Sequence, residues 1–228
     1  YDPYMQLNGL NQLIDVLLEQ SSARATDIQI GKLTGRYSGE RGGDIYADDC
    51  GFSAYFDAFM SSSIAAALAQ FLESFLKNEI LRIKKNDGDS AKVEEHIRTI
   101  KMRKAHDFWS VSKFWCLDSN TVKHGIVSGS LQLLDALNLT HQLPVNSTNY
   151  IKVLFEYRNY VMHNGVEWEK SQRDKFKEAI SATGTEGFYW SKSGGEDNIC
   201  YLKDKYIREL MVFCNELYRA FYPDFNRI

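Results

Sequence analysis

Apolar residues recur at steps of three and four along most of the chain, a spacing that places them on one side of an α-helix. At the start, an Asp-Pro pair at positions 2 and 3 supplies a cap and a first turn. The apolar positions that follow it are Leu7, Leu10, Ile14, Leu17 and Leu18. The pattern predicts an amphipathic helix that ends near residue 20.

The pattern weakens between residues 21 and 51, where glycine, serine and mixed charges dominate. This composition predicts a loop, with a short strand over residues 27–33. Its glycine-rich part, residues 31–43, lacks the lysine-serine pair of a phosphate-binding P-loop and therefore gives no support for nucleotide hydrolysis.

Longer helical patterns follow. Residues 53–85 are apolar nearly all round in their first half and basic at their end, which predicts a long helix in the middle of a bundle. Residues 91–115 predict one or two helices with a basic face. Residues 120–139 and 147–163 predict two more helices, and the pair Asn164-Gly165 is typical of a helix terminator.

The carboxyl-terminal part combines helices with a hairpin. Residues 169–182 predict a polar helix, and two short aromatic or β-branched runs around residues 193–196 predict a small β-hairpin. A last helix is predicted over residues 203–222. The whole pattern predicts a mainly α-helical bundle in one domain, residues 1–228, in which residues 1–52 form a helix plus loop and residues 53–228 form the core.

Composition narrows the function classes. The chain has 228 residues and a net charge of −3, which provides no overall attraction to nucleic acids, so an RNA site would have to be local. Neither a secretion signal nor an uncharged membrane-spanning run is apparent, which predicts a cytoplasmic protein without membrane contact. The four cysteines, spaced far apart, predict reduced and mostly buried thiols with no metal or cofactor: Cys50, Cys116, Cys200 and Cys214.

The candidate chemistry lies in the stretch YRNYVMHNG, residues 157–165. In a helix, Asn159 and His163 are four residues apart and share one face, and Arg158 is long enough to reach the same place. The Asn159 amide would orient the imidazole, while Phe155, Val161 and Met162 would hold the helix against the core. A histidine that caps the helix end and an arginine paired with a carboxylate would explain the same residues without any function.

The segment Arg158-Asn159-Tyr160-Val161-Met162-His163 resembles the R-N-x-x-x-H signature of the HEPN superfamily, and the helix at residues 66–76 resembles the family helix that carries an acidic residue, here Glu73. The resemblance implies a helical bundle that dimerises and cleaves RNA without a metal. It also implies that Arg158, Asn159 and His163 are catalytic and that Glu73 holds Arg158 by an ion pair.

Metal-free RNA cleavage needs a proton acceptor, a proton donor and a cation for the phosphate, which histidine and arginine provide. A run of basic side chains is a further candidate for RNA-backbone contacts: Arg98, Lys101, Arg103 and Lys104. The expected role is a toxin or antiviral defence ribonuclease with an RNA substrate and an antitoxin or regulatory protein as a further partner. The alternative is a non-catalytic module that binds RNA, a nucleotide or a protein.

Overall fold

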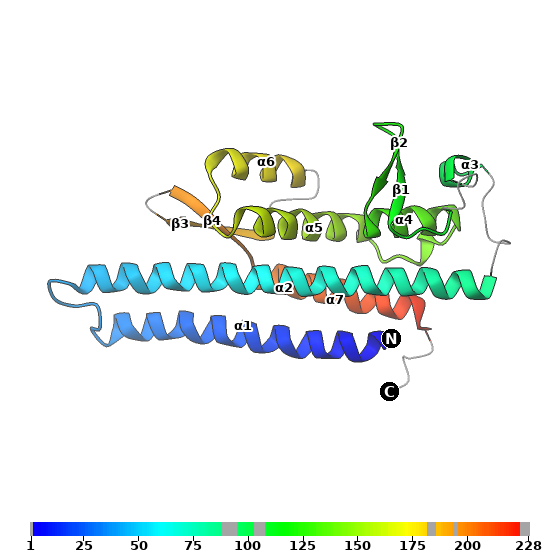
Figure 1. The fold of residues 1–228 in the computed structure, drawn as a ribbon. Coiled ribbons are helices and arrows are strands. Elements are labelled where there is room, and N and C mark those ends of the chain that lie inside the picture. The colour runs from blue at the N-terminus through cyan, green and yellow to red at the C-terminus, as the bar shows by residue number, and fades with distance from the viewer. Residues whose placement is uncertain (1, 88–94, 103–107, 182–185, 194–195, 224–228) are drawn as a thin grey trace. The chain divides into compact units, whose positions relative to one another are not determined.

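The computed structural model describes residues 2–87, 95–102, 108–181, 186–193 and 196–223 (Figure 1). This part of the chain is mainly helical with two small antiparallel hairpins, which confirms the predicted mainly α class. The helices are α1 (Pro3–Leu33), α2 (Gly42–Asp87), α3 (Ile97–Met102), α4 (Ile126–Ala136), a 3-10 turn (Thr140–Gln142), α5 (Ser147–Asn164), α6 (Lys170–Ile180) and α7 (Asp204–Phe221). The strands are β1 (Lys113–Cys116), β2 (Thr121–His124), β3 (Phe188–Ser193) and β4 (Glu196–Leu202).

The chain forms two compact units, each assembled from separate stretches of sequence. The first unit contains residues 1–6, 70–147 and 214–228, and the second contains residues 7–69 and 148–213. Residue 53, the predicted start of the core, lies inside α2, so no boundary falls there. The helices α1, α2 and α7 each contribute residues to both units.

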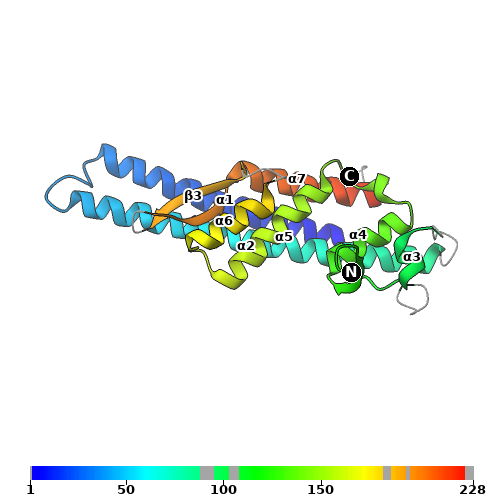
Figure 2. The ribbon, with the colours of Figure 1, turned by 90° about the horizontal axis from the view of Figure 1, so that it is seen from above.

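The second unit contains a long helical hairpin in place of the predicted glycine-rich loop. Helix α1 continues to Leu33 and α2 already begins at Gly42, so neither a loop over residues 21–51 nor a strand over residues 27–33 exists. Contacts between the helices hold the polar end of α1: Ser21 donates a hydrogen bond to Asp57 at 2.7 Å, and the Arg24 guanidinium lies 4.4 Å from the Phe56 ring centroid. Figures 1 and 2 show α1 beside the first part of α2.

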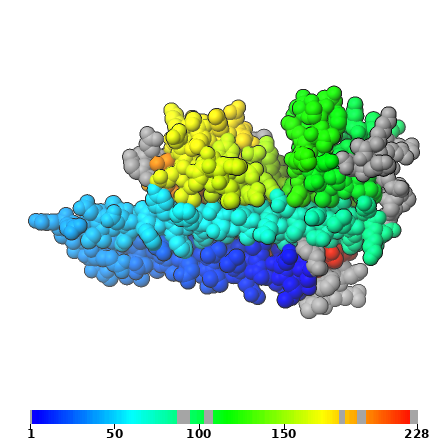
Figure 3. All heavy atoms as spheres, viewed as in Figure 1, coloured from blue at the N-terminus to red at the C-terminus, as the bar shows by residue number. Residues whose placement is uncertain are grey.

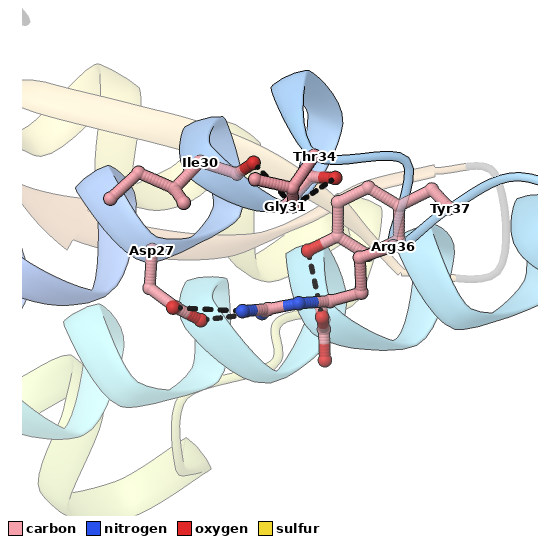
Figure 4. Close-up of polar contacts among 7 residues, drawn as sticks. Asp27, Ile30, Gly31, Thr34, Arg36 and Tyr37 are labelled. Carbon is pink, nitrogen blue, oxygen red and sulfur yellow. Dashed lines mark hydrogen bonds and ion pairs between the residues drawn. The ribbon is translucent and has the colours of Figure 1, made fainter.

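The connection between the two helices is short and tightly bonded (Figure 4). Arg36 donates two hydrogen bonds to the Asp27 carboxylate, at 2.6 and 3.0 Å, and Tyr37 donates one to Asp49 at 2.8 Å. Gly42 lets α2 begin directly against the backbone of Tyr37, because a Cβ at this position would lie 1.9 Å from the Tyr37 carbonyl oxygen. The glycines of this segment therefore serve a close turn.

The rest of the second unit is packed around aromatic rings. The hairpin β3–β4 pairs Phe188 with Leu202 and Trp190 with Cys200, close to where the sequence predicted it. Tyr157 of α5 is fully buried, with its ring 5.3 Å from that of Phe188 and its hydroxyl donating to the Cys200 carbonyl at 3.2 Å. The bounds of α5 and α6 confirm the helices predicted there.

The first unit departs from its predicted helices. Only the short α3 forms within the described part of residues 91–115, and the hairpin β1–β2 replaces the helix ends expected near residues 115 and 120. Asn120 has a φ of 49°, the left-handed conformation of a tight turn, and it follows the turn-forming residues Asp118 and Ser119. Short aromatic and β-branched runs flank this turn, so the hairpin signal was present in the sequence.

The end of α7 completes the core of the first unit. The Phe75 ring lies 5.7 Å from Phe221 and 6.4 Å from Tyr218 and Tyr222, measured between centroids. Tyr222 also donates a hydrogen bond to the buried carboxylate of Glu79, which accepts a second from Arg82. The last helix, predicted over residues 203–222, is confirmed by the bounds of α7.

Helix α2 carries one further feature. Its residues 42–86 include an 18-residue window long and apolar enough to cross a membrane, with 56% of that window buried inside the protein. Such a window admits up to two charged side chains, so it does not contradict the absence of an uncharged run, and the predicted lack of membrane contact stays a prediction. A buried core helix meets the same criterion, so the window by itself assigns no membrane contact.

Candidate functional site

Helix α5 holds the candidate site on a firmly anchored scaffold. One side of the helix is buried in the second unit through Ile151, Leu154, Tyr157 and Val161, each at most 8% exposed. A helix that is packed along its whole length keeps its outward side chains in a fixed geometry. The predicted role of Val161 in holding the helix against the core is confirmed.

The opposite side of α5 is open to solvent and carries two of the predicted catalytic residues. Its members lie at helical steps of three, four and seven, and all are exposed or half-exposed: Lys152, Phe155, Glu156, Asn159, Met162 and His163. We call this set the signature face. Met162 is 68% exposed, so the expectation that it packs into the core is wrong. Its position three residues after Asn159 turns it outward with the polar residues.

Arg158 stands beside this face and bonds to its neighbour. Its guanidinium donates a hydrogen bond to the Asn159 side-chain oxygen at 3.1 Å, and Arg158 is half-buried whereas Asn159 is exposed. Among the described residues, His163 accepts or donates no hydrogen bond, so the expected pairing of Asn159 with the imidazole is not formed. The Asn159 amide bonds to the Arg158 guanidinium instead of to the imidazole.

The end of α5 is tied down directly beside His163. Asn164 donates to the Tyr160 carbonyl at 2.9 Å and accepts from Gln172 of α6 at 2.7 Å. Gly165 follows with a φ of 75°, which confirms the predicted helix terminator. His163 therefore occupies the last turn of a helix with a fixed end.

The segment after the helix joins the β4 strand. Glu167 forms a β-bridge with Ile199, and the Trp168 backbone donates to the Asn198 carbonyl at 2.7 Å. The Trp168 indole donates to the Gly165 carbonyl at 2.8 Å. The hairpin predicted from the sequence thus braces the helix end that carries His163.

Tyr160 precedes His163 by three residues in α5, and the surroundings of its phenol affect its protonation. Removal from water raises the pKa of Tyr160, and the carboxylates of Glu156 and Glu178 raise it further. Tyr160 therefore stays protonated at neutral pH. His163 is the one histidine of this helix, and histidine is the side chain that most often transfers protons in enzymes.

Glu73, the predicted partner of Arg158, lies in the first unit and is half-buried. Its ion pair with Arg158 stays a prediction. The first unit contains a different carboxylate pair that the sequence did not indicate: Glu79 is 1% exposed and accepts a hydrogen bond from Arg82 at 2.8 Å. Glu79 of α2 therefore has a structural role, because it pairs with Arg82 inside the first unit.

Of the predicted basic run, the structure describes Arg98 and Lys101. Arg98 is fully buried, and its guanidinium donates to the carbonyls of Phe108, Ser110 and Lys113 at 2.6 to 2.8 Å. Because its donors are used inside the protein, Arg98 cannot contact an RNA backbone, and this expectation is wrong. Lys101 is exposed, with its ammonium 5.3 Å from the Trp115 ring centroid. The other two members, Arg103 and Lys104, lie outside the described residues.

Two further observations concern ligating side chains. In the part of the chain that the structure describes, no three His, Cys, Asp or Glu side chains gather where they could hold a metal ion. All four cysteines are free thiols, of which Cys200 and Cys214 are buried. His96 pairs with Asp135 at 3.0 Å in the first unit.

No protein-family model matches this chain, and neither the curated proteins nor the solved structures yield a significant match.

Proposed function

We propose that the protein is a metal-independent endoribonuclease of the HEPN type that works as a homodimer. The observation that carries the proposal is the position of Asn159 and His163 on the solvent side of one anchored helix, with the half-buried Arg158 bonded to Asn159 beside them. A cation and a histidine, held within one helical turn and a half, fit the needs of phosphate-ester cleavage.

In this reaction the RNA 2′-oxygen attacks the adjacent phosphorus, and the bond from phosphorus to the 5′-oxygen breaks. One imidazole removes the proton of the 2′-hydroxyl, and a second gives a proton to the departing 5′-oxygen. Arg158 would bind the phosphate oxygens. The products carry a 2′,3′-cyclic phosphate and a free 5′-hydroxyl.

The number of histidines supports a site made by two copies. His163 is the single histidine in the sequence of the second unit. A site built from the second unit alone would therefore take its pair of imidazoles from two chains. A role as a toxin or antiviral defence effector, restrained by an antitoxin or regulatory protein, remains part of the proposal.

The test is cleavage of end-labelled single-stranded RNA in EDTA by the wild type, Arg158→Ala and His163→Ala. We expect His163→Ala to lose roughly 10²- to 10⁴-fold in rate, as for removal of a general acid-base group. His124→Ala is the matched control, because His124 is an exposed histidine of β2 in the first unit. Equal cleavage by wild type and His163→Ala would contradict the proposal.

The same assay also tests a second candidate function. The resemblance also covers modules that bind RNA, a nucleotide or a protein without cleaving, and the half-buried Arg158 would suit phosphate binding in such a module. RNA retained by the wild type and released by Arg158→Ala, with no product from either, would favour this alternative.

A further inference from the structure

The hairpin of β1 and β2 rises from α4 in the first unit as a two-stranded sheet (Figures 1 and 3). Such a sheet has two outer edges, and each edge presents main-chain N–H and C=O groups that the opposite strand of the hairpin does not use. The two edges of this hairpin differ. Side chains of the protein bond to one edge, and the other has no partner among the described residues.

The register of the hairpin shows which main-chain groups point outward. Gly125 donates to the Ser112 carbonyl at 3.0 Å, so this pair is hydrogen-bonded. Hydrogen-bonded and non-hydrogen-bonded pairs alternate along an antiparallel ladder, so the next pair, Lys113 with His124, is non-hydrogen-bonded. The residues of such pairs turn their main-chain groups to the outer edges: Lys113 and Trp115 on β1, and Val122 and His124 on β2.

Side chains of the first unit close the outer edge of β1. The Gln132 amide of α4 accepts a hydrogen bond from the Trp115 N–H at 2.9 Å and donates one to the Trp115 carbonyl at 3.0 Å. Arg98 donates to the Lys113 carbonyl at 2.8 Å. A side-chain amide that bonds to both main-chain groups of one residue takes the place of a further strand, so the sheet cannot grow on this side.

The outer edge of β2 has no such cover. All four residues of β2 are exposed, and Val122 is 43% exposed. Among the described residues, the main-chain N–H and C=O groups of Val122 and His124 have no hydrogen-bond partner. Unpaired main-chain groups along an exposed strand are the template on which another extended chain adds as a further strand.

Charge opposes a second copy of the hairpin as the occupant of this edge. A pairing of two β2 strands that uses the outward groups of both copies sets Val122 opposite His124, and it therefore sets Lys123 opposite Lys123. Like charges directly opposite one another in neighbouring strands are destabilising. Lys123 is exposed and forms no ion pair with the carboxylates of the described residues, so its ammonium is open to an acidic side chain.

We propose that the outer edge of β2 binds an extended acidic segment of another protein as a third strand. Opposite Lys123 this segment carries a glutamate or an aspartate, and opposite Val122 it carries an apolar side chain. The two positions are adjacent in sequence and face opposite sides of the sheet. The ligand class is therefore a strand of alternating acidic and apolar residues, in which main-chain bonds give affinity and side chains give specificity.

This interface goes beyond the proposed function. The hairpin belongs to the first unit, whereas the helix that carries His163 belongs to the second. Binding at β2 involves none of the signature residues, and His124 takes part through its main chain alone. It is therefore measured without RNA cleavage, and it would stand if the ribonuclease proposal failed.

The first test is a ¹⁵N NMR titration of the full chain with a capped seven-residue peptide of alternating valine and glutamate. We expect saturable shifts of the Val122 and His124 amide resonances, because both N–H groups gain a partner. The matched control is the same peptide N-methylated on its valines, whose N–H groups would face β2, and it should cause no such shifts. No saturable shift with the unmodified peptide, or equal shifts with both peptides, would overturn the proposal.

Two substitutions at one position separate the main chain from the side chain. Val122→Pro removes the outward N–H and no bond inside the hairpin, whereas Val122→Thr keeps the N–H and the β-branch. We expect Val122→Pro to weaken peptide binding by roughly tenfold, the effect of a lost hydrogen bond, and Val122→Thr to weaken it by less than about threefold. Equal affinities would overturn the main-chain contact, which the N-methylated peptide tests with an unaltered protein.

A charge reversal tests the acidic character of the partner. Lys123→Glu should weaken binding of the glutamate peptide by roughly fivefold and strengthen binding of a peptide with lysine in place of glutamate, as expected for one charge pair across neighbouring strands. Unchanged affinities for both peptides would overturn the acidic partner.

Two other occupants give distinct results in the same NMR experiment. Shifts of Val122 and His124 that grow with protein concentration in the absence of peptide would show self-pairing of two copies. Shifts caused by a short oligouridylate, with none caused by the peptide, would show a surface for RNA. Either result would overturn the proposal.

Discussion

The sequence predicts RNA contacts for both Arg158 and Arg98, but the two arginines have different surroundings in the structure. Arg158 is half-buried and its guanidinium bonds to the exposed side chain of Asn159, whereas Arg98 is fully buried and bonds to three backbone carbonyls. A buried guanidinium with its donors satisfied acts as a cross-link between backbone segments. Arg98 therefore belongs to the folding of the first unit.

This role predicts the effect of replacing Arg98 by methionine, which keeps much of the volume and removes the donors. Carbonyls left unpaired inside a protein cost about 1–3 kcal/mol each, so we expect the free energy of unfolding to fall by roughly 3 kcal/mol or more. Denaturant unfolding followed by circular dichroism measures it. Lys101→Met, at an exposed site, should change it by less than about 1 kcal/mol. Similar values for both variants would refute the cross-link.

At the scale of elements, the hairpin of α1 and α2 depends on contacts between residues far apart in sequence. Ser21 bonds to Asp57 and Arg24 packs on Phe52 and Phe56, so the polar end of α1 is held by α2. Helix propensity alone does not decide such a segment, because tertiary contacts routinely override it. The tight start of α2 at Gly42 then sets where the second helix begins.

The two glycines at the start of α2 provide a matched pair of variants. Gly42→Ala would place a Cβ 1.9 Å from the Tyr37 carbonyl oxygen, whereas a Cβ at Gly43 meets nothing within 4 Å. We expect Gly42→Ala to lower the free energy of unfolding by about 1–3 kcal/mol through overpacking. Gly43→Ala should be neutral or raise it by up to about 1 kcal/mol, because alanine favours the helix. Thermal melts compare them, and equal melting temperatures would contradict this account.

At the scale of the whole molecule, buried tyrosines make stability depend on alkaline pH. Burial raises the pKa of Tyr201 to about 12 and raises the pKa of Tyr157 well above its ordinary value of 10.0. Because the folded-state pKa exceeds that of the unfolded chain, this contribution to stability is fully present below pH 10.0 and is lost as the pH rises through the folded values.

We therefore expect unfolding to accompany phenolate formation as the pH rises from about 10 to about 12. Phenolate absorbance and circular dichroism, recorded together, measure the two events. Tyr201→Phe should move the alkaline midpoint of unfolding to higher pH, because one group that favours the unfolded chain is removed. Phenolates that form in full while the helices remain intact would contradict this expectation.

The sequence by itself determined the helical class, the bounds of α5, the β3–β4 hairpin and the position of His163 at a helix end. These features depend on local information: helical spacing, the turn residues around position 194 and the left-handed Gly165 after the helix. All of this information is contained in residues that are near one another in sequence. Such patterns survive in any tertiary context that covers the apolar side.

The tertiary structure alone decided which faces are covered. The continuation of α1 to Leu33, the burial of Arg98, the outward position of Met162 and the exposure of Ile45, Phe52 and Phe59 all depend on which distant segment packs where. The periodicity of these three apolar residues looks the same in sequence whether they face a core or solvent. The packing of α1 and of the segment after α5 against α2 decides that they lie at the surface.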